Sequence, residues 1–77
     1  MPTLLITRGY TFRFRTGDCA EQPHVHITGN GGSAKVWLGP AVLARYRGYT
    51  EHRIGVILAI TLDHEGEWLG RWREVCG

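Results

Sequence analysis

The sequence predicts an α+β fold: a small antiparallel sheet of about four strands, with a C-terminal helix, or two helices, packed on one face. Apolar residues recur with a period of two before Tyr49 and close to 3.6 after it, which predicts strands followed by helix. The 77 residues suffice for one domain, residues 1–77, with a single small core. Eleven glycines, about twice the usual share, indicate many turns. The length excludes a two-domain enzyme and a barrel of eight β/α units.

Four runs of residues in the first half of the chain predict strands. Tyr10, Phe12 and Phe14 alternate with polar residues, which is typical of a half-buried antiparallel strand with an aromatic inner face. The stretch from Gly29 to Gly32 predicts a hairpin turn, because glycine and asparagine accept positive φ angles. The segment Ala41–Tyr49 predicts either a short helical turn or an edge strand. The four predicted strands are Thr3–Thr7, Tyr10–Arg15, His24–Thr28 and Ala34–Leu38.

The residues after Tyr49 predict a helix. Thr50 is a candidate N-cap, and Glu51 in the first turn interacts favourably with the helix dipole. Gly66 and Gly70 interrupt the pattern, each at a cost of up to about 1 kcal/mol relative to alanine. We therefore expect either one long bent helix or two helices that meet near Gly66. The predicted apolar stripe consists of Ile54, Ile57, Leu58, Leu62, Trp68, Leu69, Trp72 and Val75.

Part of this helix, Ile54–Leu62, is apolar on all sides and needs cover on more than one face. Four short strands cover only one face. The remaining face is expected either to bind a partner, a second copy of the chain or a second small protein, or to be covered by the Ala41–Tyr49 segment. The predicted interface residues are Ile54, Val56, Ile57, Ala59 and Ile60.

Strand parity predicts which side chains share the open face of the sheet, opposite the helix. This face gathers cations, imidazoles and one indole, a mixture that suits phosphate or single-stranded RNA. The residues placed there are Thr11, Arg13, Arg15, His24, His26, Lys35 and Trp37. Among them, the predicted anion-binding or nucleic-acid-binding residues are Arg13, Arg15, Lys35 and Trp37.

The two histidines, His24 and His26, allow three interpretations. They can chelate a metal together with Cys19. They can also act as a general acid and base that cleave RNA, with Lys35 or Arg13 stabilising the developing charge, so the candidate catalytic residues are His24, His26 and Lys35. The third interpretation is two strand histidines hydrogen-bonded to neighbours. The chain contains no phosphate-binding glycine loop or paired-cysteine motif, and we assign no metal site and no cofactor.

Charge and cysteine content bear on the partner and the compartment. Residues 1–50 contain six Lys or Arg against two Asp or Glu, whereas residues 51–77 contain three against five, so an anionic partner is expected at the strands.

Cys19 and Cys76 do not make a disulfide framework. The longest apolar run, Val56–Ile60, is far shorter than the roughly 20 residues of a membrane span. We expect a soluble cytoplasmic protein with reduced thiols and no membrane partner.

Three motifs resemble those of a family of small bacterial and phage proteins, domain of unknown function family 4160. Glu21–Ile27 is similar to its E-P-P-H-V-H-V motif, with Gln22 in place of the first proline. Ala34–Leu38 with Pro40 is similar to its A-K-F-W-L-x-P strand, and Trp72–Gly77 to its W-x-E-x-x-G tail. Such proteins are often encoded beside a second small protein in pairs that look like toxin–antitoxin modules.

The resemblance implies that the chain is a component of such a module and acts by protein–protein binding. Two alternatives come from the residues themselves. One is a small metal-independent ribonuclease that uses the histidine pair. The other is an RNA- or DNA-binding module without catalysis, and RNA is accordingly a further candidate partner.

Overall fold

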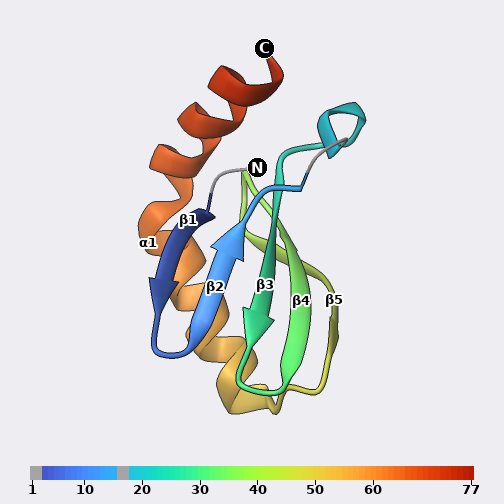
Figure 1. Ribbon diagram of the computed structural model, residues 1–77, viewed down its shortest axis with the longest axis vertical. Coiled ribbons are helices and arrows are strands. Elements are labelled where there is room, and N and C mark those ends of the chain that lie inside the picture. The colour runs from blue at the N-terminus through green and yellow to red at the C-terminus, as the bar shows by residue number, and fades with distance from the viewer. Residues whose placement is uncertain (1–2, 16–17) are drawn as a thin grey trace.

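A computed structural model describes residues 3–15 and 18–77 and confirms the α+β fold (Figure 1). The strands form one antiparallel sheet in chain order, β1-β2-β3-β4-β5, and the helix α1 crosses one face of it. The elements are β1 (Thr3–Thr7), β2 (Tyr10–Arg13), the short 3₁₀ helix η1 (Asp18–Ala20), β3 (His24–Gly29), β4 (Gly32–Trp37), β5 (Val42–Arg47) and α1 (Glu51–Cys76).

The hairpin between β3 and β4 forms where the sequence predicts it. Asn30 and Gly31 adopt positive φ angles of 52° and 83°, and the strands pair up to Gly29 and Gly32. Gly29 also has a positive φ, and a Cβ atom there would collide with the carbonyl oxygen of Gly9. Only glycine therefore lets the first two hairpins approach this closely.

The sheet has five strands, whereas the sequence predicts about four. The segment Ala41–Tyr49 contains β5, so the edge-strand alternative is correct and the helical turn is wrong. Lys35 pairs with Arg45 but Val36 pairs with Leu43, so β5 carries one extra residue at this point. Such a bulge shifts the alternation by one position between Leu43 and Arg45, so no single period runs through the whole strand.

One continuous helix follows, and the two-helix alternative is wrong. The Thr50 hydroxyl accepts a hydrogen bond of 3.2 Å from the Arg53 amide and caps the start of α1, as expected. Ile57, Thr61, Trp68 and Trp72 are its buried residues and form one face. Leu62 and Val75, assigned to the buried stripe from the sequence, are instead 58% and 41% exposed.

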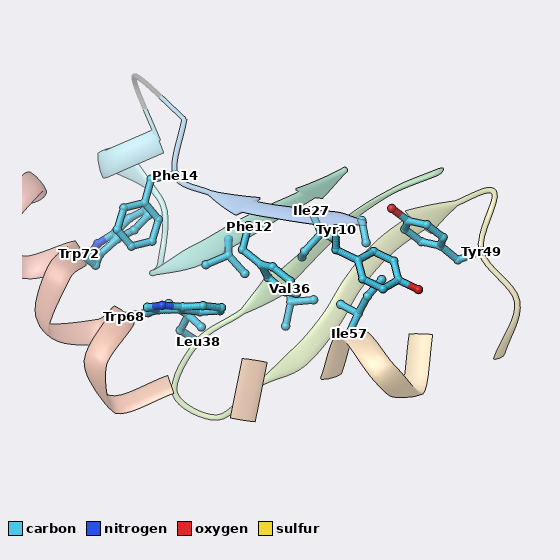
Figure 2. Close-up of a cluster of buried hydrophobic side chains, with 12 residues drawn as sticks. Tyr10, Phe12, Phe14, Ile27, Val36, Leu38, Tyr49, Ile57, Trp68 and Trp72 are labelled. Carbon is cyan, nitrogen blue, oxygen red and sulfur yellow. The ribbon is translucent and has the colours of Figure 1, made fainter. Parts of the chain in front are cut away.

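The core lies between this helix face and the sheet, and aromatic rings dominate it (Figure 2). Phe12 packs on Trp68 with ring centroids 5.3 Å apart, and Phe14 meets Trp72 edge to face at 5.1 Å. The inner face predicted by strand parity is confirmed, since all of its members are buried. These are Tyr10, Phe12, Phe14, Val25, Ile27, Val36 and Leu38.

Tyr49 joins this core from the segment between β5 and α1. Its ring contacts Tyr10 edge to face at 5.9 Å, and its hydroxyl donates a 2.7 Å hydrogen bond to the Gly29 carbonyl. Burial, with a smaller contribution from Tyr10, raises the pKa of the Tyr49 phenol above its usual value.

A disulfide joins Cys19 to Cys76, so the prediction of reduced thiols is wrong. The two cysteines are 57 positions apart in sequence, but the fold brings their Cα atoms within 5.3 Å, a normal separation for a disulfide. The bond fastens η1 to the last turn of α1. Disulfides persist mainly in oxidising compartments, so this bond gives no support to a cytoplasmic location. That location stays a prediction.

The predicted interface residues on the helix occupy different environments. Ile57 is buried in the core and is not available to a partner, because it faces the sheet. Ile54, Val56 and Ile60 are half-buried against the core, and Ala59 is exposed. Within the described residues, no helix is both long and apolar enough to cross a membrane.

Candidate anion-binding site

The open face of the sheet carries a row of paired polar residues that crosses four strands. Arg13 on β2 pairs with His26 on β3, His26 pairs with Lys35 on β4, and Lys35 pairs with Arg45 on β5. Residues that pair directly across antiparallel strands project from the same face. Three cations and one imidazole therefore lie side by side on the face opposite α1.

An open pocket of about 250 Å³ lies over part of this row. Four of its lining residues are cations, and His26 and Ser33 add further polar groups. The cations come from three segments, because Arg15 follows β2, Lys35 lies on β4, and Arg45 and Arg47 lie on β5. The full lining is Arg15, His26, Ile27, Ser33, Ala34, Lys35, Arg45, Tyr46 and Arg47.

Lys35 is the most buried of the four cations, with only 8% of its surface exposed. Its ammonium group donates a 2.7 Å hydrogen bond to the Glu21 carboxylate and lies 4.4 Å from the centre of the Trp37 ring. A carboxylate and an aromatic face both stabilise an ammonium ion. Lys35 is therefore held in place as a fixed positive charge at the inner edge of the pocket.

The three arginines of the pocket lack such compensation. Arg15, Arg45 and Arg47 are exposed, and none has a carboxylate partner among the described residues. Arg45 lies directly opposite Lys35, and Glu21 compensates the charge of Lys35 but not that of Arg45. A bound anion would neutralise the arginines, which makes the pocket a candidate anion-binding site.

Sequence reasoning located part of this site and missed part. Arg15 and Lys35 were predicted and line the pocket, and His26 lies beside them. Arg13 belongs to the same row but lies outside the pocket lining, and Trp37 contacts Lys35 from the next row. The missed residues are Ser33, Arg45 and Arg47. In β5, the alternation of Arg45 and Arg47 around Tyr46 was the sequence signal that could have placed both arginines on one face of a strand.

His24 does not lie on the open face in the way that strand parity predicts. Its ring is fully buried and contacts the Trp72 ring of α1 at 5.2 Å and the Trp37 ring at 5.5 Å. The pairing of β2 with β3 stops at His26, so no strand lies beside His24 on that side. This opening allows the ring to reach the helix.

The histidine environments favour a structural role for His24. Its Nδ1 donates a 2.8 Å hydrogen bond to the Gln22 carbonyl, and its ring meets His26 edge to face at 5.0 Å. A fully buried ring does not reach an external phosphodiester, so His24 is poorly placed as half of an acid–base pair. Of the three candidate catalytic residues, His26 and Lys35 border the pocket.

Cys19 cannot add a thiolate to a metal site at the two histidines. Its sulfur is bonded to Cys76. Over residues 3–15 and 18–77, no cluster of three or more His, Cys, Asp or Glu side chains is arranged to hold a metal ion.

Comparison with protein families matches residues 9–73 to the Domain of unknown function (DUF4160). Neither the curated proteins nor the solved structures yield a match to this chain. The matched region runs from the turn before β2 almost to the end of α1, and it includes all of the pocket residues. The chain therefore belongs to the DUF4160 family.

Proposed function

We propose that this protein is a nucleic-acid-binding module that holds the backbone of single-stranded RNA or DNA on the open face of its sheet. The observation that carries the proposal is the convergence of Arg15, Arg45 and Arg47 with Lys35 on one pocket, without carboxylates on the arginines in the part of the chain that the structure describes. Guanidinium groups bind phosphate oxygens through paired N–H donors.

The positive charge on this face extends over a distance that fits a nucleic-acid strand better than a compact ligand. The cations continue beyond the pocket, because Arg13 extends the row onto β2. Successive phosphates of one strand can therefore each meet a positive charge. Binding fits the geometry better than cleavage does, because the burial of His24 removes half of the candidate acid–base pair from reach.

Binding of a labelled single-stranded oligonucleotide at several salt concentrations tests the proposal. If about three phosphates are neutralised, the affinity falls with salt at a logarithmic slope of about −2, since each contact contributes about −0.7 on single strands. Arg45→Gln is expected to weaken binding and to make this slope shallower by about 0.7. Arg73→Gln, which removes an exposed cation from α1, is the matched control and should leave both quantities unchanged. Binding that is insensitive to salt, or an equal loss in both variants, would refute the proposal.

A second candidate function is binding of a partner protein, in a toxin–antitoxin-like pair or as a second copy, through the outer face of α1. The observation that favours it is a strip of small and apolar residues on that face. Leu62 is 58% exposed, Ala59 is exposed, and a Cβ atom added at Gly55 or Gly66 would meet nothing within 4 Å. Another helix can approach such a strip closely.

Co-expression with the product of a neighbouring gene, followed by size-exclusion chromatography with light scattering, tests this second function. A complex or a dimer is expected, and Leu62→Arg should disrupt it. Ile6→Arg changes an apolar residue on β1 that is even more exposed than Leu62, and it should leave the assembly intact. A protein that stays monomeric alone and in the presence of its neighbour would exclude this function.

A further inference from the structure

The structure assigns the pocket on β4 and β5 a more specific ligand: we infer that it binds the terminal phosphate monoester of a nucleic-acid strand. This inference rests on the proposed nucleic-acid binding and names the part of the strand that occupies the pocket. Three features of the pocket support it: its net positive charge, its hydrogen-bond donors and its surroundings on the sheet.

The charge of the pocket exceeds what an internal phosphodiester neutralises. Its lining contains four cations, and the Glu21 carboxylate on Lys35 is the one acidic side chain paired with them in the described part of the chain. A phosphodiester has a single negative charge, whereas a phosphate monoester has a charge of about −1.5 to −2 at neutral pH. The monoester is therefore the better match in charge.

The donors point to the same ligand. Arg45 and Arg47 are two positions apart on β5, so their side chains lie on the same face about 7 Å apart at the Cα atoms. Ser33 pairs with Arg47 and adds a hydroxyl, and Arg15 approaches from the far side of β3. A monoester presents three unesterified oxygens to such a set, whereas a diester in mid-strand presents two.

The surroundings of the pocket favour a nucleic acid over a phosphorylated peptide. Arg13 continues the row of charges beyond the pocket onto β2, where it is available to a further phosphate of a strand that ends in the pocket. The half-buried Trp37 indole lies beside Lys35 and offers an aromatic surface next to these charges. A peptide with one phosphate has no counterpart for this further cation outside the pocket.

The test compares single strands of about 12 nucleotides that are identical except for a terminal phosphate. One strand has a 5′-phosphate, one a 3′-phosphate, and one has hydroxyls at both ends, with the fluorophore attached internally. At one salt concentration, a strand with a terminal phosphate should bind about tenfold more tightly than the hydroxyl strand, as expected for one further charge-assisted hydrogen bond.

Two variants assign the preference to the pocket. Arg47→Gln should abolish most of the preference for the phosphorylated strand, with Arg45→Gln as a second variant of the same kind. Both residues are exposed on an edge strand, and circular dichroism verifies that the variants fold. Arg13→Gln is the matched control on the same face, outside the pocket, and should weaken binding of all three strands equally.

Each outcome bears on a different claim. Equal affinity for all three strands would overturn the terminal-phosphate inference and leave backbone binding in place. No binding by any strand would overturn both. A phosphoserine peptide that binds as tightly as the phosphorylated strand would also overturn the inference, because it would assign the pocket to a protein ligand.

Discussion

Reduction of the Cys19–Cys76 disulfide is expected to destabilise the protein by up to about 4 kcal/mol. The bond closes a loop with a sequence separation of 57 residues, and the chain-entropy relation gives this value for a loop of that length. The total stability of a domain of this size is about 4–11 kcal/mol, so the bond contributes a large share. For a domain of 60–100 residues, the expected fall in melting temperature is roughly 15–30 °C.

Thermal unfolding followed by circular dichroism, with and without a strong reductant, measures this effect. The double variant Cys19→Ser/Cys76→Ser is the control and should melt at the same temperature in both conditions. It should also match the reduced wild-type protein. If reduction lowers the melting temperature of the wild-type protein by only a few degrees, loss of loop-closure entropy in the unfolded chain is not the main effect of the disulfide.

Three further predictions follow from local geometry. Because burial raises the pKa of Tyr49, the fold favours its neutral form, and stability should fall as the pH rises above about 10; urea titrations should show a weaker fall in Tyr49→Phe. Glu21→Gln removes the carboxylate from Lys35 and should strengthen oligonucleotide binding and steepen its salt dependence, whereas unchanged binding would contradict the role given to Lys35. Gly66→Ala, in open space on α1, should raise the free energy of unfolding by up to about 1 kcal/mol, while Gly48→Ala, at a φ of +80°, should lower it.

The parts of the fold that depend on local pattern were predictable. The alternation of Tyr10, Phe12 and Phe14 predicts the inner face of β2 and the position of the core. Thr50 predicts the start of α1. In each case the residues that determine the structure are neighbours in sequence, so one short window contains the whole signal.

The features that sequence reasoning missed or left open between alternatives depend on distant contacts. The continuity of α1 results from the burial of Trp68 and Trp72, each worth on the order of 3–5 kcal/mol, against a cost of about 1 kcal/mol for each glycine. The disulfide forms because the fold places η1 next to the end of α1. Neither effect is visible in a local pattern.

The candidate site was predicted in part for the same reason. Arg15 and Lys35 lie in regular alternation, but the bulge in β5 obscures the face to which Arg45 and Arg47 belong. The burial of His24 depends on where β2 stops pairing with β3, which is a property of the sheet and not of the histidine motif.

The most direct test of the central claim, that the open face of the sheet binds nucleic acid, is a nuclear magnetic resonance titration of the labelled protein with a single-stranded oligonucleotide. The largest amide shifts are expected along the row of Arg13, His26, Lys35 and Arg45, with little change on the outer face of α1. Shifts confined to the outer face of α1, or none at saturating oligonucleotide, would contradict it.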